Sequence, residues 1–118
     1  MMTASKLANK ITELALEKKG RQIVKIDIKD ITDYADYFIV ITGDSGLQIK
    51  AIVDHIEDEL AKEGIKAYSK EGYEYQRWVL LDYVDVVVHV FNQQAREFYG
   101  IERLYADAKM EFITDEKA

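Results

Sequence analysis

The chain has 118 residues, 48% of them hydrophobic, which suits one domain that buries about two-thirds of its unfolded surface. It contains no cysteine, so disulfides, thiolate metal sites and thiol nucleophiles are excluded, and no apolar run is long enough to cross a bilayer. The formal charge of −6 disfavours binding to DNA, RNA or an anionic membrane and favours a basic protein surface as the partner. The N-terminal residues lack the apolar core of a signal peptide, so we expect a cytoplasmic protein.

The first predicted element is an amphipathic helix over residues 5–19. Its apolar residues recur at helical spacing and would form one buried face: Leu7, Ile11, Leu14 and Ala15. Thr3 or Ser5 can cap its start, and Gly20 is expected to end it in a left-handed conformation.

Two strands and a second helix follow. Residues 23–28 alternate apolar and charged side chains, which predicts a strand with one wet face, and after a polar loop residues 37–42 form a continuous apolar run typical of a strand covered on both faces. A long helix is predicted over residues 46–63, with Ser45 as its N-cap and Gly64 as its end.

The second half is predicted to be mainly a hairpin. Residues 65–69 resemble a short third strand, so that strand, helix and strand suggest a right-handed crossover between parallel strands. The apolar runs 78–81 and 86–91, separated by the turn-sized break 82–85, predict a β-hairpin.

A third helix is predicted over residues 93–99, with Asn92 as its cap and Ala95, Phe98 and Tyr99 as its apolar residues. One more helical turn is expected within 101–108, and residues 109–118 read as a polar tail that frays. Together the elements predict a single α/β domain with a mixed sheet of about five strands flanked by helices.

One loop suggests anion binding. Gly43, Asp44 and Ser45 lie between an apolar strand and a helix N-terminus, where backbone N–H groups attract phosphate. The segment is neither a P-loop nor a GxGxxG fingerprint, and the Asp44 carboxylate would repel an anion. The alternative is a tight turn with a serine cap.

Catalytic patterns are poorly supported. A two-carboxylate metal site needs two acids on alternate positions of one strand, whereas Asp82 and Asp85 flank a turn, and Glu57 and Glu59 diverge on a helix. His55 has no second ligand at metal-binding spacing, and neither has His89, which fits a hydrogen-bonded structural histidine better than a base. No catalytic residue, metal or cofactor is therefore assigned.

Aromatic residues gather around the hairpin, with acidic residues between them. The aromatic members are Tyr73, Tyr75, Trp78 and Tyr83, and the acidic members are Glu71, Glu74, Asp82 and Asp85. Large aromatic anchors with a charged rim are typical of protein interfaces, although Trp78 could equally fill the core.

The sequence resembles the ribosomal silencing factor family, also called the Iojap or RsfS family. The resemblance covers about residues 5–108, and the hairpin is its most specific part. It is carried by segments 36–45, 78–91, 95–99 and 101–105, with Gln48 and Lys50–Ile52 in the long helix. Two departures are Val84, where the family usually has glycine, and Tyr105-Ala106 in place of Trp-Gly.

The resemblance implies a nucleotidyltransferase-like α/β fold over residues 1–108 without established transferase activity, often as a homodimer. It further implies binding to the large ribosomal subunit through the ribosomal protein numbered fourteen. Occupying that subunit-joining face blocks the small subunit sterically and lowers translation when nutrients run short.

The main hypothesis is therefore a non-enzymatic translation repressor that docks through the hairpin. The expected docking residues are Trp78, Leu81, Asp82, Tyr83 and Asp85, with Tyr73 and Tyr75 as additions. Strand alternation complicates this set, because Trp78 and Asp82 share one face of the strand and Leu81 and Tyr83 the other. Two rivals remain: a divergent nucleotidyltransferase that uses Gly43–Ser45 for phosphate, and a factor for large-subunit assembly with the same docking surface.

Overall fold

The structure is a computed structural model that describes residues 2–114. Helices and strands follow one another as α1 (Ala4–Glu17), β1 (Arg21–Asp27), β2 (Tyr37–Thr42), α2 (Gly46–Lys62), β3 (Ser69–Glu71), β4 (Trp78–Asp82), β5 (Val86–Phe91), α3 (Gln93–Tyr99), α4 (Ile101–Leu104) and β6 (Lys109–Ile113). The strands form one sheet in the order β3-β4-β5-β2-β1-β6. Strands β2 and β5 pair in parallel and the other neighbours pair antiparallel, so the sheet is mixed as predicted.

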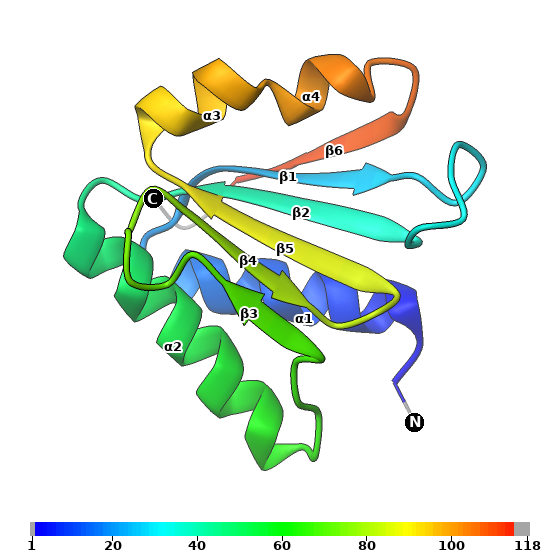
Figure 1. The fold of residues 1–118 in the computed structure, drawn as a ribbon. Coiled ribbons are helices and arrows are strands. Elements are labelled where there is room, and N and C mark those ends of the chain that lie inside the picture. The colour runs from blue at the N-terminus through cyan, green and yellow to red at the C-terminus, as the bar shows by residue number, and fades with distance from the viewer. Residues whose placement is uncertain (1, 115–118) are drawn as a thin grey trace.

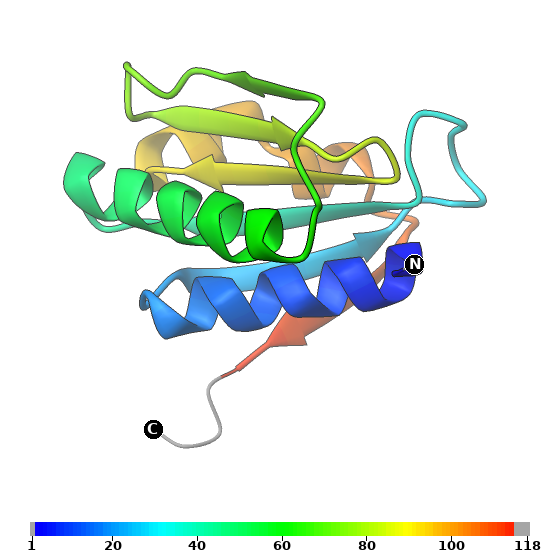
Figure 2. The same ribbon diagram turned by 90° about the horizontal axis from the view of Figure 1, so that it is seen from below.

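Helices cover both faces of this sheet. α1 and α2 lie on one face, and α3 and α4 lie on the other (Figures 1 and 2). In the central strand β2, Ile39 and Ile41 pack toward α1 and α2, whereas Phe38 and Val40 pack toward α3 and α4. A strand with apolar residues on both faces needs this double cover, which explains the continuous apolar run of β2.

The predicted helix caps are confirmed. The Ser45 hydroxyl accepts a hydrogen bond from the Gln48 N–H (3.1 Å), and the Asn92 side-chain oxygen accepts one from the Ala95 N–H (2.7 Å). Thr3 caps α1 in the same way. Each cap satisfies one backbone donor that the first turn of a helix leaves free.

The predicted role of Gly20 is wrong. α1 ends at Glu17, and the residue in the left-handed region is Lys19, with φ 61°. Gly20 has a different reason to lack a side chain, since a Cβ there would lie 2.9 Å from Cγ2 of Ile41 and 3.1 Å from the carbonyl oxygen of Ala15. The glycine lets the chain pass closely over the sheet on its way into β1.

The predicted third strand and its parallel crossover are also wrong. The segment before Ser69 packs Ile65 and Ala67 against the core without strand pairing, and β3 pairs antiparallel with β4. The parallel partner of β2 is β5 instead. The reason is burial: every residue of β5 is buried, which fits the sheet centre, while the short, polar β3 suits an edge.

The expected polar tail contains a sixth strand. β6 (Lys109–Ile113) pairs antiparallel with β1, with Met110 opposite Ile26 and Phe112 opposite Val24. Three of its five residues are apolar, and pairing with β1 satisfies backbone groups that would otherwise face water. Residues 115–118 of the expected tail lie outside the described part of the chain.

The hairpin is confirmed. β4 and β5 pair antiparallel with Trp78 opposite Phe91 and Leu80 opposite His89. At the turn, Val84 has φ 73°, and its N–H donates to the side-chain oxygen Oδ1 of Asp82 (2.7 Å). A β-branched residue seldom adopts a left-handed conformation, so the Val84 backbone is strained. Within the described residues no helix has the length and apolar character needed to cross a membrane.

Candidate binding site: an aromatic groove between β4 and α3

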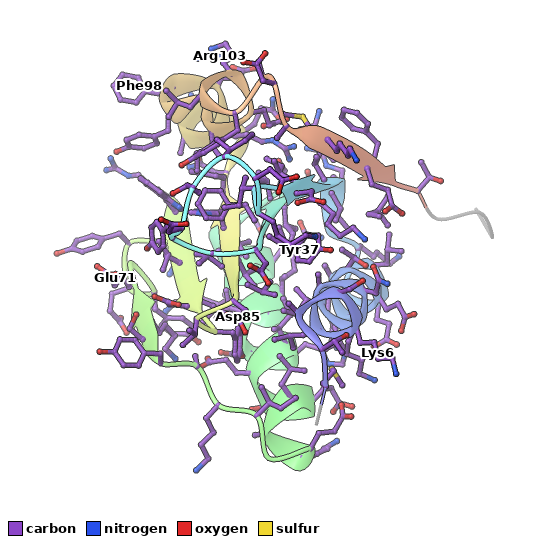
Figure 3. The ribbon with its side chains drawn as sticks, turned by 90° about the vertical axis from the view of Figure 1, so that its right-hand side faces the viewer. Lys6, Tyr37, Glu71, Asp85, Phe98 and Arg103 are labelled. Carbon is purple, nitrogen blue, oxygen red and sulfur yellow. The ribbon has the colours of Figure 1, made fainter. Side chains whose placement is uncertain are left out.

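A groove of about 980 Å³ opens where the start of β4 meets α3. Tyr75 on the preceding loop, Trp78 on β4, and Phe98 and Tyr99 at the end of α3 line it. Phe98 is 79% exposed, and Tyr75 is similarly open to solvent. Figure 3 shows Phe98 directed away from the body of the protein. Exposed aromatic side chains around a concave surface are typical of a binding site for another macromolecule.

Trp78 forms the fixed centre of this groove. Its ring lies 4.5 Å from the ring of Tyr99 and 5.1 Å from that of Phe91 between centroids. Its indole Nε1 donates a hydrogen bond to Nδ1 of His89 (3.1 Å). Packing on both sides and one directional hydrogen bond hold the half-buried indole in a single orientation, so little side-chain entropy remains to be lost on binding.

His89 supports the groove from below. Burial lowers its pKa to about 4, so the imidazole is neutral near pH 7. Because Nδ1 accepts the Trp78 hydrogen bond, the proton lies on Nε2, which has no hydrogen-bond partner among the described residues. The ring of Phe38 meets the imidazole edge-on with centroids 4.7 Å apart. The structural interpretation of His89 fits this environment better than a role as base.

The structure separates the predicted docking residues. Trp78 and Tyr75 line the groove, whereas Asp82 and Asp85 lie at the other end of the hairpin. Asp82 is four residues of extended strand from Trp78, which corresponds to about 13 Å between the two Cα atoms. Tyr73 faces α2, where its hydroxyl donates to the Asp54 carboxylate (2.8 Å). These residues therefore do not form one continuous patch.

Two predicted docking residues belong to the core. Leu81 is fully buried and Tyr83 is 7% exposed, both in the cluster beneath α1 and α2. The reason is the strand alternation noted above, which turns both side chains toward that core. The structure therefore removes Leu81 and Tyr83 from the docking surface.

Sequence reasoning missed Phe98 and Tyr99 as site residues. Both were predicted only as apolar residues of α3, together with Ala95, and the residues that the structure buries in this helix are Ala95 and Arg96. A signal was available, because adjacent residues on a helix point about 100° apart and a seven-residue helix buries only a narrow stripe. At least one of two neighbouring aromatic residues in such a helix must therefore face solvent.

Two N–H groups of the Gly43–Ser45 loop are already hydrogen-bonded within the protein. The Gly43 N–H donates to the Phe91 carbonyl (2.9 Å), and the Asp44 N–H donates to the side-chain oxygen of Gln48. The side chain of Gln76 covers the helix start, since a Cβ on Gly46 would lie 2.8 Å from its Cδ. The serine cap of the alternative interpretation is present, and phosphate binding at this loop stays a prediction that the two bonded N–H groups disfavour.

No group of three or more histidine, cysteine, aspartate or glutamate side chains is placed to hold a metal ion within residues 2–114. The groove itself contains aromatic and amide side chains with one arginine, and its chemistry is that of contact rather than proton transfer.

The protein is a single α/β domain with an aromatic groove beside its hairpin, and comparison with known proteins shows its family. The sequence matches the family described as "Ribosomal silencing factor during starvation" over residues 1–118. The chain belongs to this family, which confirms the resemblance seen in the sequence.

Its relatives include ribosomal silencing factor RsfS of Bacillus subtilis, 39% identical over 94 residues that cover 80% of each chain. RsfS of Chromobacterium violaceum is 38% identical over 106 residues, covering 86% of this chain and 87% of the relative. A crystal structure of a protein from C. violaceum superposes with a TM-score of 0.86 at 33% identity, covering 97% of this chain and 95% of that one. A structure from Bacillus halodurans gives 0.81 at 33% identity, covering 92% and 99%.

Proposed function

We propose that this protein binds the large ribosomal subunit on its subunit-joining face, through the ribosomal protein numbered fourteen, and blocks the small subunit sterically. Translation in the cytoplasm would then fall when nutrients are short. Membership of the silencing-factor family supports this proposal, and the aromatic groove at Trp78 is the observation that carries it.

The groove fits a protein partner better than RNA. Trp78 presents a large apolar face with an already fixed orientation, and Phe98 and Tyr75 add exposed contact area at its rim. The chain's net charge of −6 opposes the phosphate backbone of ribosomal RNA and favours a basic protein. The groove would supply most of the binding energy, and the acidic surface would speed association.

Co-sedimentation with purified large subunits tests the docking surface. Phe98→Ala removes an exposed groove side chain, so it should weaken binding about tenfold or more while leaving stability nearly unchanged. Leu104→Ala is the control, because Leu104 is 75% exposed on α4 and does not line the groove. Equal binding by the two variants would remove the groove from the proposal, and failure of the wild type to sediment would remove ribosome binding itself.

A second measurement separates silencing from subunit assembly. Purified large and small subunits are mixed with and without the wild-type protein, and joined ribosomes are counted after centrifugation. Silencing requires the joined fraction to fall as the protein is added. If the protein binds the large subunit and the joined fraction stays constant, the assembly role is favoured, because it needs only the same contact.

The proposed function uses no catalysis. The rival nucleotidyltransferase remains testable by thermal shift with ATP and Mg²⁺, since a ligand that binds the folded protein raises its melting temperature. We expect no shift, because the N–H groups of Gly43 and Asp44 are already bonded.

We also propose a homodimer, on the strength of the family resemblance. The outer edge of β6 has no partner strand among residues 2–114 and offers surface for a second copy. Light scattering after gel filtration would measure the mass directly, and a mass of 13.6 kDa at micromolar concentration would contradict the dimer.

A further inference from the structure

A second exposed apolar surface lies at the turn end of the hairpin, away from the groove. Tyr34, Tyr68, Asp82 and Val84 line a cavity of about 300 Å³, which we call the turn-end cavity. Tyr68 is 80% exposed, and Tyr34 and Val84 are more than half exposed. Figure 3 faces this end of the molecule, where Asp85 lies below the loop that joins β1 to β2.

The walls of the turn-end cavity are held in place from behind. The ring of Tyr34 rests edge-on against Phe38 with centroids 6.0 Å apart, and its N–H donates to the Thr32 hydroxyl (3.2 Å). The Tyr68 N–H donates to the Asp82 carbonyl (2.6 Å), which fixes that residue beside the end of β4. The faces of both tyrosines stay open to solvent while their backbones are anchored.

The cavity also carries free negative charge. Oδ1 of Asp82 accepts the Val84 N–H (2.7 Å), while its second oxygen makes no hydrogen bond within the described chain. Asp33 and Asp85 are exposed nearby, and none of these three carboxylates forms a salt bridge to a residue in the range 2–114. An incoming cation would therefore not have to displace one that the protein already holds.

We propose that the turn-end cavity binds an arginine side chain of a basic protein segment. A planar guanidinium stacks on tyrosine faces and pairs with a carboxylate through two N–H groups, and its methylene stem can lie on Val84. The ammonium of lysine lacks the planar face and the paired donors, so arginine is preferred. The unpaired carboxylates repel phosphate, which argues against a nucleic-acid segment here.

This contact is separate from the proposed ribosome docking in the groove. Trp78 and Asp82 lie at opposite ends of β4, and the groove and the turn-end cavity share no lining residue. Binding of an isolated peptide needs no ribosome, so the two proposals can fail independently.

The test is a titration of ¹⁵N-labelled protein, followed by NMR, with the capped peptide Gly-Arg-Gly-Arg-Gly and its lysine counterpart. We expect the arginine peptide to shift the amide signals of Tyr68, Asp82 and Val84 in a saturable way. Its affinity should exceed that of the lysine peptide by about threefold to fivefold.

Two variants and one control locate the effect. Tyr68→Ala removes an exposed wall, and Asp82→Asn removes the charge but keeps the oxygen that accepts the Val84 N–H; each should weaken arginine binding about threefold or more. Tyr75→Ala makes the same change as Tyr68→Ala at a tyrosine that is 81% exposed in the groove, and should leave the affinity unchanged. Equal affinities for the two peptides, signal shifts centred on the groove, or an equal loss in Tyr75→Ala would each overturn the proposal.

Discussion

The indole N–H of Trp78 donates to Nδ1 of His89 across the antiparallel pair β4–β5, over 3.1 Å. The two residues are diagonal neighbours, since Trp78 lies opposite Phe91 and His89 opposite Leu80. The partly buried Trp78 at the centre of the groove is thus positioned by the buried His89. The hydrogen bond exists only while Nδ1 of His89 carries no proton. The orientation of the indole in the groove is tied in this way to the charge state of a buried histidine.

The first prediction is a loss of stability in acid that depends on His89. Its pKa is about 4 in the folded protein and about 6.5 in the unfolded chain, so the unfolded state binds the proton more readily. This contribution to stability is fully present above pH 6.5 and is lost as the pH falls toward 4, for a total of roughly 3 kcal/mol. Urea unfolding at intervals between pH 4 and 7 measures it.

The control for this prediction is His89→Gln. Glutamine can still accept the Trp78 hydrogen bond through its amide oxygen but does not titrate. Its stability should depend less steeply on pH than that of the wild type over the same interval. Parallel curves for the two proteins would mean that His89 does not titrate as described.

The second prediction concerns the hydroxyl of Tyr83. This hydroxyl is buried and has no hydrogen-bond partner among the described residues, and burial raises the pKa of the phenol above its ordinary value. Tyr83→Phe removes an unsatisfied polar group, so we expect stability to stay equal or rise by about 1 kcal/mol. Tyr37→Phe is the matched control, because the Tyr37 hydroxyl accepts from Nζ of Lys29 (2.8 Å), and it should lose stability in the same urea experiment. A clear loss in Tyr83→Phe would point to a partner inside the folded protein.

The third prediction concerns the attachment of α3 and α4 to the sheet. Arg96 is 7% exposed and donates two hydrogen bonds to the Glu102 carboxylate (2.9 and 3.0 Å) and one to the Thr42 hydroxyl (2.8 Å). Arg96→Met leaves both partners without their donor, and we expect a loss of roughly 2–4 kcal/mol in the free energy of unfolding. The loss is smaller than for a fully buried ion pair because Glu102 is partly open to water. Lys62→Met breaks the exposed pair with Glu59 and should change the unfolding midpoint very little. If the two variants unfold at the same midpoint, the buried network does not hold the helices.

The fourth prediction uses the strained turn. Val84 has φ 73°, a conformation that glycine adopts without cost, so Val84→Gly should stabilise the protein by up to about 1 kcal/mol. Val86→Gly, two residues later in the fully buried strand β5, should instead lose stability through a lost side chain and added backbone freedom. Thermal unfolding of both variants gives the comparison, and a destabilised Val84→Gly would show that the turn is held by side-chain contacts of Val84.

Local patterns predicted most of the fold. Short-range signals include the helical spacing in α1 and α2 and the caps at Ser45 and Asn92. The structure contains these helices and caps at the predicted positions. The same holds for the hairpin, because a turn-sized break between two apolar runs needs no information from the rest of the chain.

The errors arose where pairing joins distant segments. β6 pairs with β1 across more than eighty residues of sequence. Nothing within Lys109–Ile113 indicates that β1 would otherwise have an unpaired edge. The parallel partner of β2 was misassigned for the same reason, since both β3 and β5 follow α2 in the chain.

The candidate site was predicted in part. Composition identified Trp78 and Tyr75, and alternation along β4 already warned that Leu81 would face the other way. Phe98 and Tyr99 were missed, because whether a short helix exposes its aromatic residues depends on how its ends are anchored. Here that anchor is Arg96, whose partners Thr42 and Glu102 lie on β2 and α4.

The position of Trp78 has a practical consequence. It is the only tryptophan in the chain, and its partly buried indole lines the groove beside Tyr99. Any partner that covers the groove removes water from that ring, so intrinsic fluorescence emission should shift to shorter wavelength as the complex forms. The protein thus contains its own optical reporter of occupancy, and titrations can be followed without a label.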